Sequence, residues 1–294
     1  ADAEAVGVMM GSHPAQAAEL LGAWSFIAPD VSGPEVSAAL METFFAYCRE
    51  RRIGRMVVNT AVNADAARYA PQRGSRPNLV GIRTELDLTR VDRAEFESLS
   101  EPSAANDRYR IVYWVDTCPD ELAEAYCVAR AAMNDAPAVA ENVTKPVHGI
   151  ERMRGEEESS IRYGVRRLVT AAVAPDGAIG GFSTTIVFPE QPEFAEIWDT
   201  GVARGHRGRG LGVRLKAAAT LWLLREHPAA RQLYTFTAKG NARMRAVNER
   251  LGYRPAATWE IYEHEVPGAD GARTAGAVAA AVAAAARTQP AYEG

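Results

Sequence analysis

The chain has 294 residues, of which 47% are hydrophobic, and this length and composition predict a sizeable core divided between two domains. Its net charge of −4 at pH 7 excludes a protein that binds nucleic acid or anionic membranes over its whole surface. No apolar run reaches the ~20 residues of a membrane span, and three cysteines without CxxC spacing predict reduced thiols in the cytoplasm and no metal site.

The first half of the chain gives few but regular signals. From about residue 19 to residue 74, the hydrophobic pattern predicts a strand, a turn, a helix, a second strand and a second helix that ends at a glycine. The run NLVGIRTELDL (78–88) predicts a further strand. These elements form the expected core of an N-terminal domain.

The second half reads as an alternating α/β chain. Residues 119–137 have apolar residues at helical spacing, with Asp120 placed to cap the helix, and an irregular stretch leads from there to His148. A polar helix to about Ser160 precedes two strands joined by a Pro-Asp-Gly turn at 175–177. The remaining predicted elements are a strand at 194–203, a helix at 211–225, a strand at 231–238, a helix capped by Asn241 and ended by Gly252, and a strand at 258–266.

A glycine-rich and basic turn, GHRGRGLG (205–212), joins one of these strands to the helix that follows it. A strand, a glycine turn and a helix present unpaired backbone N–H groups at the positive end of the helix, and glycines let that backbone approach a bulky anion. No Gly-Lys-Ser/Thr follows, and the glycines alternate at 208, 210 and 212 rather than as GxGxxG. The turn therefore predicts a pyrophosphate site of another type.

The motif Arg207-x-x-Gly210-x-Gly212 after a strand, with Asn241 and the sequence LGY (251–253) downstream, resembles the acyl-CoA signature of the GNAT superfamily of N-acetyltransferases. The resemblance covers about residues 108–266, in the element order of that superfamily. It implies an α/β fold with a mixed, mostly antiparallel twisted sheet flanked by helices. It also implies acetyl-CoA as cosubstrate and the amine of a small molecule as acceptor.

The first half repeats the element order of the second. Thr60 lies fourteen residues before Gly74, and Thr237 lies fifteen before Gly252. The glycine turn has no counterpart, because residues 30–34 lack the arginine and the paired glycines and Pro34 removes an N–H donor. We therefore expect a degenerate and incomplete copy, and the whole chain resembles the tandem-GNAT proteins of actinobacteria, to which mycothiol synthase is related.

The resemblance assigns residues to the acyl-CoA site. The backbone from Arg207 to Gly212 would bind the pyrophosphate, Asn241 would hydrogen-bond the pantetheine arm, and the strand end at Val202 and Ala203 would border that arm. The N–H of Val202 would polarise the thioester carbonyl. The full set of predicted cofactor contacts is Val202, Ala203, Arg207, Gly208, Arg209, Gly210, Leu211, Gly212, Asn241 and Asn248.

The acceptor amine needs a base, because an alkyl amine with a pKa near 10.4 is neutral in only about one molecule in two thousand at pH 7. Glu196, eleven residues before Arg207, resembles the general-base glutamate of the histone-acetylating branch. If alternation along the strand is regular, Asp199 points to the opposite face and is the weaker candidate. Asp199 and His148, which lies in the loop that lines the acceptor pocket in the family, are predicted substrate contacts.

The leaving thiolate is where the sequence departs from the family. Many members have a tyrosine seven residues after the motif asparagine that protonates the thiolate, and this chain has Asn248 there. Asn248 is not an acid, so we expect it to hydrogen-bond the sulfur or the pantetheine. A thiol pKa near 8.5 makes the thiolate a tolerable leaving group without an acid.

These observations predict a degenerate N-terminal domain at 1–105, an acyl-CoA-binding domain at 106–267 and an alanine-rich tail at 268–294. The expected protein is a monomer or homodimer that transfers an acetyl group by direct attack on the thioester. A catalytically silent acyl-CoA sensor or scaffold is the alternative. A nucleic-acid binder that uses the basic turn is disfavoured by the net charge and by the lack of aromatic residues near the arginines.

Overall fold

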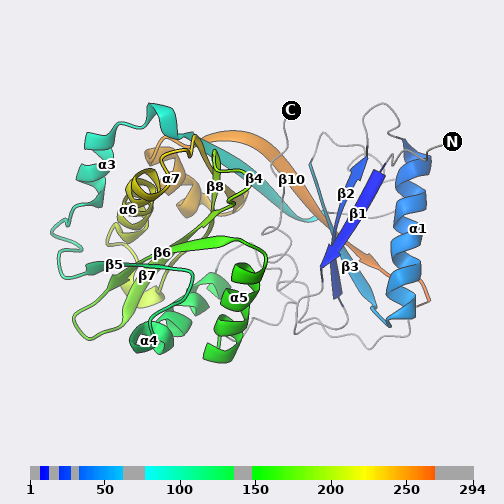
Figure 1. Cartoon of the computed structure of the whole chain (residues 1–294), viewed down its shortest axis with the longest axis horizontal. Helices are drawn as coiled ribbons and strands as arrows, with labels where there is room; N and C mark the ends of the chain where they lie inside the picture. Colours follow the sequence, from blue (N-terminus) through cyan, green and yellow to red (C-terminus); the bar gives the residue numbers. More distant parts are fainter. Residues whose placement is uncertain (1–6, 13–19, 28–32, 62–76, 136–147, 269–294) are drawn as a thin grey trace. The chain divides into compact units, whose positions relative to one another are not determined.

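The structure is a computed structural model that describes residues 7–12, 20–27, 33–61, 77–135 and 148–268 (Figure 1). The chain divides into two compact units. Unit 1 comprises residues 1–82, 138–146 and 257–294, and unit 2 comprises residues 83–137 and 147–256. Neither unit is therefore a single continuous stretch of chain.

Unit 1 contains a sheet and one long helix. The sheet has the order β1-β2-β3-β10, in which β1 is antiparallel to β2, β2 is parallel to β3, and β3 is antiparallel to β10. Buried side chains of α1 and β3, among them Phe45 and Met56, form its core. The elements are β1 (Gly7–Ser12), β2 (Leu20–Ile27), α1 (Pro34–Glu50), β3 (Arg55–Ala61) and β10 (Arg254–Glu265).

The start of α1 agrees with the prediction that this repeat lacks an anion cradle. Helix α1 begins at Pro34, which has no N–H to donate, and its N-cap Gly33 is extended, with φ −176°. Strand β1 was not predicted from the sequence. The predicted helix that ends at Gly74 and the alanine-rich tail beyond Gly268 lie outside the described residues.

Unit 2 contains a larger sheet with the order β4-β9-β8-β7-β6-β5. Strands β5 to β8 form antiparallel neighbours, and β8 and β9 are parallel, so the sheet is mixed and mostly antiparallel, as predicted. The strands are β4 (Pro77–Asp87), β5 (Arg110–Val115), β6 (Arg166–Val173), β7 (Ile179–Val187), β8 (Phe194–Val202) and β9 (Gln232–Ala238). The helices are α3 (Arg93–Ser100), α4 (Asp120–Arg130), α5 (Ile150–Arg162), α6 (Leu211–Glu226) and α7 (Ala242–Arg250).

Two helical layers cover the sheet of unit 2 (Figure 1). Helices α3, α6 and α7 bury one face, where Leu168, Ile197 and Leu223 belong to one core cluster. Helices α4 and α5 bury the other face, where Tyr126, Val169 and Phe182 belong to a second cluster. Leu168 and Val169 are consecutive residues of β6 and belong to different clusters, because successive side chains of a strand point to opposite faces. Among the described helices, none combines the length and the hydropathy that crossing a membrane requires.

The last strands of the two repeats are exchanged between the units. Residues Trp259–Glu265 of β10, the last strand of the second repeat, pair with β3 in unit 1. Strand β4, the last strand of the first repeat, lies beside β9, and its residues 83–87 belong to unit 2. The units therefore differ from the predicted division at 105/106, because the sequence places strands along the chain without revealing their neighbours.

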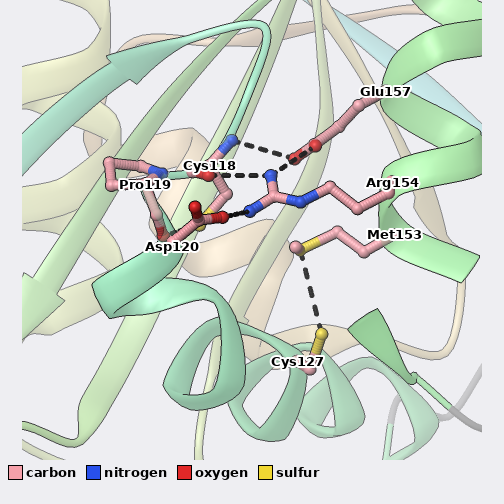
Figure 2. A network of polar contacts seen from close by, with 7 residues as sticks. All are labelled: Cys118, Pro119, Asp120, Cys127, Met153, Arg154 and Glu157. Atoms are coloured by element: carbon pink, nitrogen blue, oxygen red, sulfur yellow. Dashed lines mark hydrogen bonds and ion pairs between the residues drawn. The ribbon is translucent and has the colours of Figure 1, made fainter. Parts of the chain in front are cut away.

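A polar network fastens α5 to the start of α4 in unit 2 (Figure 2). The Arg154 guanidinium donates to the Cys118 carbonyl, to Glu157 at 2.7 Å and to Asp120 at 2.6 Å. Glu157, whose side chain is 4% exposed, also accepts the Cys118 N–H at 3.0 Å. Asp120 was predicted to cap α4, but the N-cap is Pro119 and no side chain caps the helix. The Asp120 carboxylate is bonded to Arg154 instead.

Arg154→Met is expected to lower the free energy of unfolding by about 3 kcal/mol, because it leaves the buried Glu157 carboxylate without its cation. The measurement is chemical denaturation at pH 7. Arg225→Met is the matched control: Arg225 is paired with its exposed neighbour Glu226, and its loss should cost less than about 0.5 kcal/mol. Equal losses in the two variants would contradict the role given to the network.

Candidate active site

Strands β8 and β9 separate in the middle of unit 2. Their parallel pairing ends at Ile197 and Thr235, although β8 continues to Val202 and β9 to Ala238. The Thr235 hydroxyl bonds the Ile197 carbonyl at 2.9 Å at the last paired position. Beyond this point, residues 198–202 of β8 have no register partner on β9. This unpaired part of β8 leads to Val202 and Ala203, the strand end that the resemblance places beside the pantetheine arm.

The N–H groups of Val202 and Ala203, at the end of β8, point in opposite directions. Ala203 donates its N–H to Gly180 at 3.0 Å, so this N–H is used by the sheet and is not available to a ligand. Because successive N–H groups of a strand point to opposite sides, the N–H of Val202 points away from β7 and toward the side of β9. The geometry therefore favours Val202 as a ligand contact and assigns Ala203 a structural role.

The glycine turn presents an open helix terminus. Gly208 and Gly210 have φ values of +78° and +74°, in the left-handed region that favours glycine. Gly210 is the N-cap of α6 and no side chain caps that helix, so the N–H groups of its first turn, from Leu211 onward, have no side-chain partner. Gly208, Arg209 and Gly210 are exposed, and a Cβ at Gly208 would meet nothing within 4 Å.

Hydrogen bonds from buried polar side chains fix the position of this turn. Asn106 donates to the Arg209 carbonyl at 2.9 Å. Arg214 of α6, which is 6% exposed, donates to the carbonyls of Ser100, Asn106 and Tyr109 and so ties the segment after α3 to the helix. The Tyr109 hydroxyl contacts His206 Nδ1 at 2.7 Å. The sequence analysis missed these supports, because they are contacts between residues about a hundred positions apart.

Arg207 is bonded within the protein. Its Nε donates to the Val202 carbonyl at 2.9 Å, and its Nη2 donates to Asp135 at 2.9 Å. Arg204, which is 82% exposed, also bonds Asp135, at 3.2 Å. The hydrogen bonds from Arg204 and Arg207 lower the pKa of the Asp135 carboxyl. A phosphate that binds Arg207 would therefore compete with an ionised carboxylate.

A β-bulge changes the predicted geometry of the two acidic residues on β8. Glu196 pairs with Ile186 and Asp199 pairs with Thr184, and the register shifts at Trp198, which lies between them. Ile186 and Thr184 are two residues apart on β7 and therefore share a face. The expectation that Asp199 points away from Glu196 is therefore wrong, because the bulge interrupts the alternation and puts both carboxyl groups on the side of α4.

Glu196 is 3% exposed and is hydrogen-bonded by neighbours on its own face. Trp198 Nε1 donates to Glu196 Oε2 at 3.0 Å, and Tyr234, its register partner on β9, bonds it through the phenol. Burial raises the pKa of Glu196 to about 8, against the opposing effects of these hydrogen bonds and of Arg83. A carboxyl with this pKa is suited to accept a proton near neutral pH.

Asp199 and His148 lie in the same electrostatic environment. Asp199 is 7% exposed, and the buried Arg130, which bonds Glu156 at 2.6 Å, acts on both residues. Burial, with help from Arg130 and Arg152, lowers the pKa of His148 to about 4, so the imidazole is neutral at pH 7. Neither ring nitrogen of His148 has a partner among the described residues. The rest of the predicted pocket loop, 136–147, lies outside them.

The two asparagines of the predicted site differ in their surroundings. Asn241 caps α7 as predicted, accepting the Met244 N–H at 3.2 Å, and its side-chain N–H₂ group still has donors to offer. Asn248 is 1% exposed and fully bonded to Lys216, Thr237 and Thr84. The prediction that Asn248 contacts the sulfur or the pantetheine needs correction, because its amide has no open side in this structure.

Sequence reasoning missed Tyr234 and Lys216. Tyr234 could be inferred only from the register of β8 and β9, which two separate apolar runs do not reveal. Lys216 is a charged residue inside the otherwise apolar predicted helix 211–225, and that was a usable signal for a buried ion.

Comparisons with known proteins agree with this geometry. Residues 141–253 match the model of the acetyltransferase (GNAT) family. A tandem GNAT protein from the clavulanic acid biosynthesis pathway is similar in structure, with a TM-score of 0.72 and 24% identity over 90% of this chain and 80% of that chain. No curated protein sequence matches the chain.

Two bacterial structures extend the likeness in fold. The GCN5-related N-acetyltransferase from Sphaerobacter thermophilus has a TM-score of 0.64 and 16% identity, over 93% of this chain and 80% of that one. The GCN5-related N-acetyltransferase from Kribbella flavida has a TM-score of 0.56 and 18% identity, over 90% and 89%. The tandem arrangement predicted from the sequence is thus found in a solved structure.

Proposed function

We propose that this chain, whose residues 141–253 match the model of the acetyltransferase (GNAT) family, transfers an acetyl group from acetyl-CoA to the amine of a small molecule. The observation that carries this proposal is the uncapped start of α6, with two left-handed glycines, beside the opening between β8 and β9. Acetyl-CoA would supply an activated acetyl group as a thioester, and the amine would attack it directly.

The residues around the opening have distinct tasks in this proposal. The N–H groups from Arg207 to Gly212 hold the pyrophosphate at the positive end of α6. The Val202 N–H donates to the thioester carbonyl oxygen, where negative charge develops during attack. The Asn241 side-chain N–H₂ donates to the pantetheine arm. Ala203 supports this strand end through its bond to Gly180.

Glu196 is the proposed base, and Asp199 and His148 are proposed contacts of the acceptor. The raised pKa of Glu196 supports the first role, and the shared face of Glu196 and Asp199 supports the second. Because the His148 imidazole stays neutral at pH 7, it can accept or donate a hydrogen bond without repelling a protonated amine. Turnover of acetyl-CoA with a panel of polyamines, aminoglycosides and amino-acid metabolites tests the proposal.

Arg207→Ala should raise the apparent dissociation constant for acetyl-CoA about tenfold or more, because a charge-assisted bond to phosphate contributes ~1.5–3 kcal/mol. It should leave the affinity for the acceptor unchanged. Calorimetry with acetyl-CoA is the measurement, and Arg204→Ala is the control, since Arg204 shares the Asp135 contact but is 82% exposed. If both substitutions raise the dissociation constant equally, the cause is the lost contact with Asp135 and not a lost bond to phosphate.

A catalytically silent acyl-CoA sensor is the second candidate. The observation that favours it is the burial of Asn248, which leaves the place of the family's tyrosine without an acid. A sensor would bind acetyl-CoA without consuming it in the presence of any amine. The amine panel above separates the two functions.

We propose no nucleic-acid or membrane partner. A monomer or a homodimer in the cytoplasm remains our proposal for its state and location, in keeping with three thiols that are buried and free. The relation to mycothiol synthase also remains a prediction.

A further inference from the structure

One carboxylate joins the segment after α4 to the glycine turn. The short helix η3 (Ala131–Asp135) continues directly from α4 and ends at Asp135. Asp135 Oδ1 accepts from Arg204 Nη2 at 3.2 Å, and Asp135 Oδ2 accepts from Arg207 Nη2 at 2.9 Å. The protein therefore already holds an anion of its own on the arginine to which the phosphate of a cofactor would bind.

A ligand can reach this contact from solvent. The side chain of Asp135 is 23% exposed, that of Arg207 is 31% exposed and that of Arg204 is 82% exposed. The bond from Arg207 Nε to the Val202 carbonyl fixes the guanidinium beside the strand end where the pantetheine arm would pass. Because two anions that share one guanidinium repel each other, a phosphate that bonds Arg207 Nη2 would displace the carboxylate of Asp135.

Helix η3 also lies against β8, on the side proposed for the acceptor. A Cβ built on Gly201 would stand 3.2 Å from Met133 Sδ, so η3 packs closely on the β8 backbone at this glycine. Gly201 and Asp199 pair with Phe182 and Thr184 in regular register, and residues two apart in a strand share a face. Helix η3 therefore covers the strand next to the proposed acceptor contact Asp199.

We propose that Asp135 competes with the pyrophosphate of acyl-CoA for Arg207, and that binding of acyl-CoA releases η3 from the glycine turn. The phosphate takes the place of the carboxylate on the guanidinium, and no covalent bond changes. Release of η3 frees the face of β8 beside Asp199, so the acceptor binds after the cofactor. This inference rests on the proposed transferase function, because it uses the same glycine turn.

The strengths of the contacts permit this exchange. An exposed ion pair such as that of Arg204 with Asp135 contributes little to stability, because water and salt screen it. A pyrophosphate gains charge-assisted bonds to Arg207 and also to the N–H groups at the start of α6, which no side chain caps. A ligand shifts a conformational equilibrium by the difference in its affinity for the two states, and the competition for Arg207 supplies that difference.

Asp135→Asn should lower the dissociation constant for acetyl-CoA about fivefold, because the amide keeps the shape of the side chain but has no charge with which to compete for the arginines. Calorimetry is the measurement. Glu226→Gln is the matched control: it also removes one negative charge and one exposed ion pair, with Arg225, but it lies at the other end of α6 and should leave the affinity unchanged. Unchanged or weaker binding in Asp135→Asn, or equal tightening in both variants, would overturn the proposal.

Amide hydrogen exchange tests the release of η3 without turnover. In the wild type, CoA should raise the exchange rate of the amides of η3 and lower that of the amides at the start of α6. Inorganic pyrophosphate should have the same two effects, whereas pantetheine, which has no phosphate, should have neither. In Asp135→Asn, the amides of η3 should exchange rapidly before any ligand is added. If CoA protects the start of α6 and leaves the exchange of η3 unchanged or slower, η3 is not released.

The proposed function and the role of Asp135 can fail separately. A wild-type protein that binds CoA and releases η3, but turns over no amine of the panel, would contradict the transferase function alone. A protein that turns over an amine, in which Asp135→Asn has the wild-type affinity for acetyl-CoA and η3 exchanges at the same rate with and without CoA, would contradict the role of Asp135 alone.

Discussion

Glu196→Gln is expected to lower kcat by ~10²–10⁴-fold, the range for a lost general base, with little change in affinity for acetyl-CoA. Glutamine keeps the shape of the side chain and can still accept from Trp198 at the 3.0 Å position, but it cannot take a proton from the amine. Because the pKa of Glu196 is about 8, wild-type turnover should rise with pH up to that value. The residual activity of the variant should climb further, as the free amine deprotonates.

Asp199→Asn is the matched control for this prediction. Both carboxyl groups lie on the face of β8 toward α4, so either could take the proton. If Glu196 is the base, Asp199→Asn should change KM for the acceptor more than kcat. A large loss of kcat in Asp199→Asn, with only a few-fold loss in Glu196→Gln, would transfer the role to Asp199.

The stability of the protein as a function of pH tests two points. It shows whether Glu196→Gln is folded, and it shows whether burial raises the pKa of Glu196. Its folded-state pKa, about 8, lies above the ordinary value of 4.5 for a glutamate carboxyl. The carboxyl therefore contributes stability that is fully present below pH 4.5 and is lost as the pH rises through 8. Thermal melting of Glu196→Gln should lack this decline.

Gly210→Asp should lower the affinity for acetyl-CoA more than about 100-fold, because it places a carboxylate at the N-terminus of α6, where the pyrophosphate would bind. The carboxylate would cap the free N–H groups and repel the phosphates. Calorimetry should give one acetyl-CoA site per wild-type chain, because α1 begins at a proline and lacks a comparable cradle.

Gly210→Asn is the control for the backbone. Asparagine has the shape of aspartate and tolerates a positive φ such as the +74° of Gly210, but it carries no charge. It should retain most of the affinity that aspartate removes. Equal losses in the two variants would mean that the fold of the turn, rather than the anion site, had been damaged, and two equivalent sites in the wild type would contradict a degenerate first repeat.

Local features of the site could be predicted from the sequence. The glycine turn between a strand and the helix at 211, the cap at Asn241 and the hairpin at 175–177 depend on residues next to one another, and the structure confirms each of them. The tandem order of elements could be predicted for the same reason. The predicted acyl-CoA chemistry depends on the motif Arg207-x-x-Gly210-x-Gly212 together with Asn241 and LGY (251–253), and not on the composition.

Features that depend on strand neighbours or on burial could not be predicted. A one-residue bulge at Trp198 reverses the face of Asp199, and alternating residues in a sequence do not show where alternation is interrupted. The bond between Lys216 and Asn248 joins two helices, and only their packing removes the lysine from water. Asp135, which binds Arg207, follows a helix whose distance from the glycine turn the sequence leaves open.

The exchange of β4 and β10 affects how the protein can be made. During synthesis the ribosome releases β3 about two hundred residues before β10, its partner, so the sheet of unit 1 remains open along one edge until translation is nearly complete. The first half expressed alone would contain β4 but lack β10, the partner of β3. The second half expressed alone would contain β10 but lack β4, the neighbour of β9. A gene cut between codons 105 and 106 would leave residues 83–87 of β4, with Thr84, on the fragment that lacks the acyl-CoA motif. An insertion or deletion in one repeat therefore affects the sheet of both units. A protein split at this point should recover unit 2 only when the two fragments are mixed, and not when either fragment is refolded alone.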